Sequence, residues 1–360
     1  MHRLALVLLA GVFVAADWPV FRGTPEMNGV GSAKLPDQLA EVWTFKTGNA
    51  IEGAPAVVGD TVYVASADKH LYAIDRKTGK ERWKAKLGSP TKASPAVKDG
   101  NVYVGDSDGT FYAFNADGKQ LWTFKTPGEI NSGCNFAKDK ILVGSYDGTL
   151  FALKADGTKA WEFKLDQPVN GSPAVAGDLT FLAGCDSVLH VIDVNTGKEV
   201  SSADLGGQAG ATAAVRDNAA YVGTMSNAVV AIDVKTAKKL WSFEAARRQQ
   251  PFYSSAAVSE SHVFIGSRDR KMYALDRASG KEAWSFTTEG MVDGSAVLVG
   301  GRIYFGCLAT DGNFYVLDAK TGERKQELNL DSSVTGSPAV AGDCLFVGTD
   351  KGTLYCLGAK

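Results

Sequence analysis

Short apolar runs alternate with polar turns along most of the chain. In the stretch 53–83, the runs 61–65 (TVYVA) and 71–74 (LYAI) are rich in β-branched and aromatic residues, and the polar residues 66–69 (SADK) separate them. This spacing predicts a β-hairpin, because two strand-like runs joined by a short polar turn pair most easily with each other.

Two further runs flank the predicted hairpin. Residues 54–58 (APAVV) form the first and end at a Gly-Asp turn, and a polar turn at 75–80 leads into the second, which carries Trp83. The stretch from 53 to 83 therefore predicts one meander of four antiparallel strands.

The same unit recurs along the chain. The small residue that ends the second strand of each unit returns at steps of 39 to 43 residues, at Ala65, Gly105, Gly144, Gly184, Gly223, Gly266, Gly306 and Gly348. The fourth strand is marked by Trp83, Trp122, Trp161, Trp241 and Trp284, with Val200 and Gln326 in two units that lack the ring. Repeats of this length with four strands each are typical of a β-propeller, whose blades bury their faces by stacking around an axis.

The two ends of the chain are expected to close the ring. The last unit stops near residue 357 after three strands, and an isolated strand-like run at 41–46 contains Trp43. Pairing this run with the last unit would complete its fourth strand and remove an open edge. We therefore predict an all-β fold, an eight-bladed β-propeller of four-stranded antiparallel blades over residues 41–360, with an extended N-terminal arm at 17–40.

The start of the chain has the pattern of an export signal. A basic beginning is followed by an apolar run at 4–14 and the small pair at 15–16, which is typical of a secretory signal peptide. The sequence predicts a signal peptide over residues 1–16, cut before Asp17, and an exported protein that is periplasmic, at the cell surface or secreted. An uncleaved anchor is the alternative. No later run is long enough to span a bilayer, so we expect no transmembrane segment in the mature chain.

Charge and cysteine content exclude two kinds of function. The 38 basic and 40 acidic residues are mixed along the chain, with a formal net charge of -2, so no long-range field favours nucleic acid. The five cysteines lack C-x-x-C spacing, which argues against a zinc site. We interpret them as small buried apolar residues. Whether Cys344 and Cys356 form a disulfide stays open, because their predicted hairpin places them diagonally.

One turn motif carries a family resemblance. Ala73-x-Asp75-x-x-Thr78-Gly79-Lys80-x-x-Trp83 recurs in degenerate form, and it resembles the tryptophan-docking motif of pyrroloquinoline-quinone (PQQ)-type propellers. We expect the Asp to accept backbone N–H groups in the turn, the Gly to take a positive φ, and the Trp to lie between neighbouring blades. The structural docking residues are Asp75, Thr78, Gly79, Trp83, Trp122, Trp161, Trp241, Asp276 and Trp284.

The resemblance implies two different functions. Quinoprotein alcohol dehydrogenases of this superfamily are longer, with an adjacent Cys pair, a calcium site and an Asp base, whereas no two cysteines are adjacent in this chain. In size the chain is more similar to the propeller scaffold subunit of the outer-membrane β-barrel assembly machinery, which is non-catalytic. We therefore expect a monomeric protein-interaction or scaffolding module with a protein partner in the cell envelope, without catalytic residues, metal or cofactor. The alternatives are a PQQ-dependent quinoprotein oxidoreductase that also uses calcium, and a propeller that binds a glycan or peptide.

A binding site is expected at the mouth of the axial funnel. Aligning the units places a set of dissimilar residues at one equivalent loop position: Glu52, Lys92, Asn131, Asn170, Ala209, Tyr253, Asp293 and Thr335. Variation at one position of a repeated frame predicts a specific polar pocket, although solvated loop ends also vary freely.

A longer connection at 244–253 is the second candidate. It exceeds its counterparts by about three residues and combines Arg247 and Arg248 with Phe252 and Tyr253. Arg and aromatic residues are enriched at protein interfaces, so this loop is a candidate partner contact. The alternative is an ordinary loop whose Phe-Tyr pair packs inward.

Other polar residues do not form a catalytic or metal site. The Asp-Gly turns at 106–109 and 146–148 offer carboxylates of the kind that calcium prefers, but we interpret them as hairpin turns. His70, His190 and His262 fall in different units and define no triad.

Overall fold

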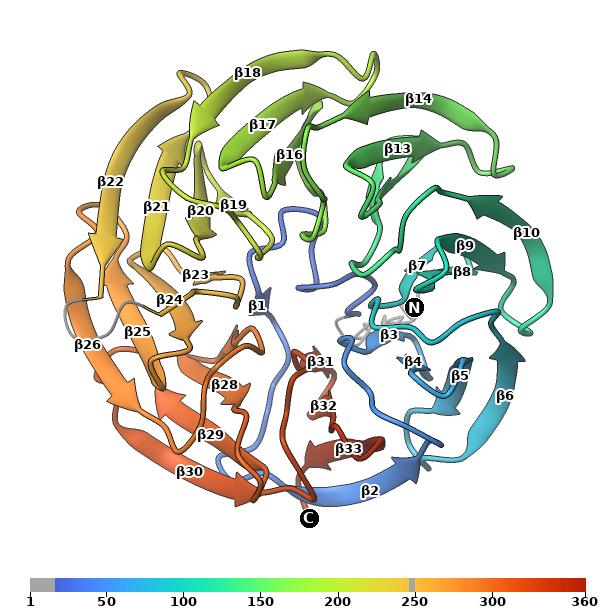
Figure 1. Cartoon of the computed structure of the whole chain (residues 1–360). Helices are drawn as coiled ribbons and strands as arrows, with labels where there is room; N and C mark the ends of the chain where they lie inside the picture. The colour runs from blue at the N-terminus through green and yellow to red at the C-terminus, as the bar shows by residue number, and fades with distance from the viewer. Residues whose placement is uncertain (1–16, 246–249) are drawn as a thin grey trace, which may run out of the picture.

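The computed structural model describes residues 17–245 and 250–360, which form eight β-sheets arranged as a ring (Figure 1). The predicted all-β, eight-bladed propeller is confirmed. None of the described residues forms a helix long and apolar enough to cross a membrane. The predicted signal peptide and the two arginines Arg247 and Arg248 lie outside the described residues.

Each blade is a meander of four strands. The first blade consists of β3 (Ala56–Val58), β4 (Thr61–Ser66), β5 (His70–Asp75) and β6 (Glu81–Lys86). The second blade holds β7 (Ala96–Lys98), β8 (Asn101–Gly105), β9 (Thr110–Phe114) and β10 (Gln120–Lys125), and the third holds β11 (Asn135–Ala137), β12 (Lys140–Gly144), β13 (Thr149–Leu153) and β14 (Lys159–Lys164). The fourth holds β15 (Ala174–Ala176), β16 (Leu179–Ala183), β17 (Val188–Asp193) and β18 (Glu199–Asp204).

The remaining blades repeat this order. The fifth holds β19 (Ala214–Arg216), β20 (Ala219–Gly223), β21 (Ala228–Asp233) and β22 (Lys238–Glu244), and the sixth holds β23 (Ala257–Val258), β24 (His262–Ser267), β25 (Lys271–Asp276) and β26 (Glu282–Thr287). The seventh holds β27 (Val297–Val299), β28 (Arg302–Gly306), β29 (Asn313–Asp318) and β30 (Arg324–Asn329). The eighth holds β31 (Ala339–Ala341), β32 (Cys344–Gly348) and β33 (Thr353–Gly358), which β2 (Ala40–Lys46) completes.

Burial follows the position of a strand within its blade. All six residues of β4 are buried, because neighbouring blades cover both of its faces. The outer strand β10 alternates between exposed and half-buried residues, since it lies at the rim. This difference explains why the middle strands read as continuous apolar runs while the outer strands carry many charged residues.

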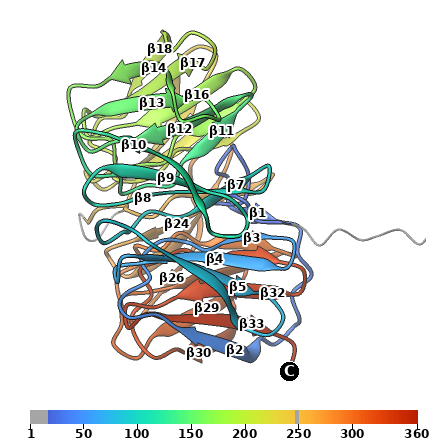
Figure 2. The same cartoon turned by 90° about the vertical axis from the view of Figure 1, so that its right-hand side faces the viewer.

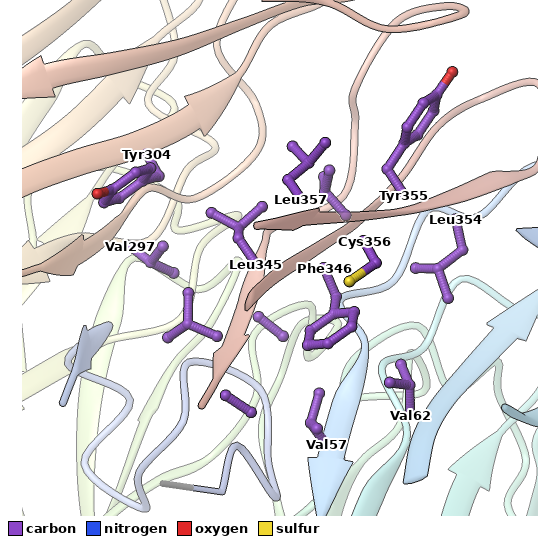
Figure 3. Close-up of a cluster of buried hydrophobic side chains, with 14 of the residues drawn as sticks. Val57, Val62, Val297, Tyr304, Leu345, Phe346, Leu354, Tyr355, Cys356 and Leu357 are labelled. Carbon is purple, nitrogen blue, oxygen red and sulfur yellow. The ribbon is translucent and has the colours of Figure 1, made fainter. Parts of the chain in front are cut away.

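The ring closes as predicted, through the two ends of the chain. Strand β2 pairs with β33 in antiparallel register, with Trp43 opposite Cys356. Figure 2 shows the two strands side by side from a second direction. Where the eighth blade meets the first and the seventh, buried side chains such as Phe346, Val57 and Val297 form one apolar cluster (Figure 3). The closure is therefore secured by burial of apolar surface as well as by backbone hydrogen bonds.

Tryptophans join neighbouring blades through one repeated contact. Trp83 donates its Nε1–H to the carbonyl of Ala116 in the next blade at 2.7 Å. A Cβ on Gly118, whose φ is +81°, would lie 2.7 Å from the Trp83 ring, so the ring requires a glycine there. The same donor–carbonyl pair occurs for Trp43–Arg76, Trp122–Ala155, Trp161–Val194, Trp241–Arg277 and Trp284–Ala319.

Two junctions lack this tryptophan. Gln326 occupies the predicted position in the seventh blade, where its amide exchanges hydrogen bonds of 2.8 Å with the backbone N–H and C=O of Leu39. In the fourth blade the prediction was wrong by one residue. Ser201 occupies the position, while Val200 lies at a β-bulge and is 60% exposed. The next blade carries Ala237 where other blades have the docking glycine, at φ +55°.

The arm crosses the centre of the ring and bonds to the inner strands. Trp18 exchanges two backbone hydrogen bonds with Val57, and β1 (Val30–Gly31) pairs in parallel with β27. Carbonyl groups of the arm accept N–H groups from Val97, Val175, Val215, Val258 and Leu298, Lys34 donates to Gly342, and Asn135 reaches Pro25 through its side chain. The arm thus contacts every blade and fixes the inner strands relative to one another.

Candidate functional site at the funnel mouth

A small polar pocket lies on the ring axis. Its volume is about 160 Å³. The structure brings the predicted mouth residues together in its wall: Glu52, Lys92, Asn131, Asn170, Tyr253, Asp293 and Thr335. Each of these residues comes directly after a buried residue, and this order repeats from blade to blade. One variable side chain per blade is therefore directed toward the axis.

The predicted residue of the fifth blade was wrong by one position. Ala209 is fully buried, whereas Gly210 lines the pocket. A Cβ on Gly210 would lie 2.8 Å from Cδ1 of Tyr253. The glycine therefore leaves the space that the Tyr253 ring occupies.

A ring of hydroxyl groups lies within the pocket wall and joins the blades. Ser94, Thr212, Ser255, Ser295 and Ser337 each accept a backbone N–H from the preceding blade, at 2.8 to 3.0 Å. Because these bonds cross between blades, they explain why small hydroxyl residues recur just before the first strand. The third blade has the reverse order, Ser132-Gly133, and Ser132 Oγ has no hydrogen-bond partner among the described residues.

Three side chains at the mouth form a cluster. Arg268 donates from Nε to Asp293 Oδ1 at 3.0 Å and from Nη2 to Oδ2 at 2.7 Å. Its guanidinium lies 4.2 Å from the centroid of the Tyr253 ring. The hydrogen bonds to Asp293 raise the pKa of Arg268 above its ordinary value, so the cation is held in place. We call these three side chains the mouth cluster.

Sequence reasoning missed Arg268. It lies in the turn between β24 and β25, that is, between the second and third strands of a blade, whereas the predicted mouth residues all precede the first strand of a blade. The run Arg268-Asp269-Arg270 was a visible indication, since it is the most basic of these turns.

Other mouth residues are tied to near neighbours. Lys92 Nζ lies 3.6 Å from Glu52 Oε2, and Thr335 donates to Asp350 at 2.7 Å. Asn131 donates to Glu129 at 3.0 Å, which leaves its Oδ1 buried and without a partner among the described residues. Asn170 donates to Cys185 Sγ at 3.1 Å. The wall thus combines paired charges with uncharged hydrogen-bonding groups.

The two aromatic residues of the candidate partner loop, Phe252 and Tyr253, lie in different surroundings. Phe252 is fully buried and packs against Tyr273, with ring centroids 5.9 Å apart, so its proposed role in a partner contact was wrong. Tyr253 belongs to the mouth cluster instead.

The docking turns use their carboxylates internally. Asp75 accepts hydrogen bonds from Arg82, from the backbone N–H groups of Lys77 and Thr78 and from the Thr78 hydroxyl. The bonds from Arg82 and then Thr78 hold the pKa of Asp75 well below its usual range. Asp276 accepts bonds from Ser279 in the same way. These aspartates stabilise turns and are not free to bind a ligand.

The residues at the mouth do not fit a quinone with calcium. The pocket is smaller than the range of about 300–1,000 Å³ that ligand sites usually span, and both Glu52 and Asp293 face a cation. The turn at 106–109 joins β8 to β9 as a hairpin, with Asp106 Oδ1 accepting N–H groups from Asp108 and Thr110. No group of three or more His, Cys, Asp or Glu side chains in the described ranges could hold a metal ion.

Comparison with known proteins places the chain in a family. A family model described as "Outer membrane protein assembly factor BamB" matches residues 33–135, 116–197 and 185–360. The chain belongs to this family of PQQ-like propellers. A search of curated proteins finds no match.

Solved structures of two functional kinds share the fold. BamB from Moraxella catarrhalis is 18% identical, with a TM-score of 0.75, over 89% of this chain and 100% of that one. A europium-containing methanol dehydrogenase is 15% identical, with a TM-score of 0.77, over 96% and 98%. The quinohemoprotein alcohol dehydrogenase from Comamonas testosteroni is 14% identical, with a TM-score of 0.79, over 96% and 81%. At these identities the likeness shows the fold alone.

Proposed function

We propose that this chain is an exported, non-catalytic scaffold that binds a protein partner at the funnel mouth and serves outer-membrane protein assembly in the cell envelope. The observation that carries the proposal is the mouth cluster, in which Arg268 lies between Tyr253 and Asp293. The match to the BamB family supports the setting.

The chemistry of the mouth cluster suits protein recognition. Tyr and Arg are the residue types that most often carry binding energy at protein interfaces. Because Asp293 already holds the Arg268 guanidinium, a partner would lose little side-chain entropy when it binds there. Arg268 keeps 37% of its side chain exposed, so it is both ordered and accessible.

The size of the pocket supports a side chain as its occupant. A volume of about 160 Å³ suits one side chain of a partner better than a large cofactor. The uncharged groups of Asn131 and Asn170 and the charges of Glu52 and Lys92 offer polar contacts around it. A partner loop that inserts one residue into the mouth would use these groups together.

Site-specific photo-crosslinking tests this proposal. A photoreactive residue at Lys92, in the mouth, is expected to capture an envelope protein, because 59% of the Lys92 side chain is exposed beside the pocket. The matched control is Lys84, which is exposed on the outer strand β6. The proposal would be contradicted by equal capture at both positions. It would also be contradicted by no capture at position 92 when the experiment is done in the cell envelope of the organism that makes the protein.

We further propose that this role needs no quinone. When PQQ and calcium are added to the purified protein, we expect the quinone to be removed by gel filtration, because the carboxylates at the mouth are paired with cations. The measurement is the absorption spectrum of the protein fraction. A retained quinone spectrum would favour the oxidoreductase alternative.

A further inference from the structure

Two cysteines share one face of the closing blade. Cys344 begins β32, and Cys356 lies in β33 opposite Phe346, which follows Cys344 by two residues. Side chains two apart on a strand share a face, and so do directly opposed residues of paired strands. Cys344 and Cys356 are therefore diagonal neighbours on that face. Figure 3 shows Cys356 within the strand β33.

A glycine leaves space beside these cysteines. A Cβ on Gly358 would lie 3.0 Å from Cys344 Sγ. Gly358 is two residues after Cys356 on β33, so it belongs to the same face. The Cys344 sulfur thus lies next to Gly358, which has no side chain, and on the same face of the blade as Cys356.

Both cysteines line a groove between the eighth and first blades. The groove has a volume of about 260 Å³ and is lined by Val42, Arg76, Lys77, Asp343, Cys344 and Cys356. Cys356 is fully buried, while Cys344 is only partly buried, and both are free thiols. Cys344 is therefore the sulfur that a molecule in the groove can reach.

The surroundings of Cys344 favour its thiolate. The neighbouring Cys356 thiol lowers the pKa of Cys344, against the opposing effects of burial and of Asp343, whose Oδ1 accepts a hydrogen bond from the Cys344 thiol at 3.5 Å. The same interaction and burial raise the pKa of Cys356, so Cys356 keeps its proton. Arg76 and Lys77 line the same groove from the first blade, and their cationic groups lie 3.5 and 3.7 Å from Asp60 Oδ1. By contrast, burial raises the pKa of Cys185, the other partly buried cysteine.

We propose that Cys344 is a modification site that undergoes thiol–disulfide exchange with small-molecule disulfides, and that Cys356 is its positioning residue. In the exchange, the Cys344 thiol gives its proton to solvent and its sulfur attacks one sulfur of the disulfide. The disulfide bond breaks, and the other half leaves as a thiolate that takes a proton from water. Cys344 is oxidised to a mixed disulfide, and the departing half is reduced to a thiol.

Glutathione disulfide is the probe for the first test. The folded protein is incubated with it near neutral pH, and the modified cysteines are identified over time by peptide mass spectrometry. Cys344 is expected to react at least about tenfold faster than Cys185, because more of it is thiolate at that pH. A mixed disulfide at Cys344 and an internal disulfide to Cys356 both count as reaction of Cys344. Equal rates at Cys344 and Cys185 would overturn the proposal.

Two variants test the part played by Cys356. Cys356→Ser keeps an O–H donor and should retain most of the Cys344 reactivity. Cys356→Ala removes the donor, so it should slow the reaction several-fold and move its pH midpoint upward. If both variants fold, as checked by melting, and react like the parent at every pH, then Cys356 has no positioning role. The comparison of Cys344 with Cys185 in the parent does not depend on either variant.

Discussion

Trp18→Ala is expected to lower the free energy of unfolding by about 3–5 kcal/mol, the usual cost of truncating a buried aromatic residue. Trp18 is 2% exposed and lies in the apolar cluster that joins the eighth, first and seventh blades. Its backbone bonds to Val57 at the start of the arm. The substitution therefore leaves a cavity where the arm begins to cross the ring.

Urea unfolding followed by circular dichroism measures this loss. The matched control is Trp122→Ala, because Trp122 lies at the rim and is only partly buried. We expect a smaller loss for the control, about 0.5–3 kcal/mol. Equal losses for the two variants would mean that the arm does not stabilise the ring more than a single rim contact.

Gly280→Ala is the second substitution with a large expected effect, a loss of about 2–5 kcal/mol. The φ of Gly280 is +72°, and a new Cβ would lie 2.5 Å from Cε3 of Trp241. The left-handed backbone costs a residue with a Cβ about 1–2 kcal/mol, and overpacking the ring adds about 1–3 kcal/mol. The substitution should therefore separate the fifth and sixth blades at their docking contact.

Gly100→Ala is the matched control for this clash. Gly100 has nearly the same backbone, with φ +76°, but nothing lies within 4 Å of a Cβ placed there. Gly100→Ala should lower the free energy of unfolding only by the backbone contribution, about 1–2 kcal/mol. If chemical denaturation finds the same loss for both variants, the tryptophan contact contributes nothing beyond the turn.

The repeated parts of the fold could be predicted from the sequence because each blade carries the same local pattern. Alternating strands, the turn glycine and the rim tryptophan recur, so the number of blades and the closure by β2 followed directly. Errors of one residue arose at Val200 and Ala209, because Ser201 stands where other blades carry the rim tryptophan and Gly210 stands where other blades carry a larger mouth residue. A serine or a glycine at such a position gives the sequence pattern no distinctive residue to align on.

Features that join distant parts of the chain could not be read from the pattern. The path of the arm depends on bonds between residues far apart in sequence, such as Asn28 and Val258. The mouth residues were predicted as a set, but the role of Arg268 depends on its contacts with Tyr253 and Asp293, which belong to other loops. Hydrophobic periodicity carries no information on these polar contacts.

The affinity of the partner captured at position 92 tests the central claim most directly. Arg268 and Arg82 are paired to an aspartate at 2.7 and 2.6 Å, with 37% and 40% of their side chains exposed, but only Arg268 lies at the mouth. With the purified partner, Arg268→Ala should weaken binding by at least about tenfold, as expected at an interface hot spot, while Arg82→Ala should match the parent. Unchanged binding by Arg268→Ala, or equal weakening by both variants, would contradict a partner site at the funnel mouth.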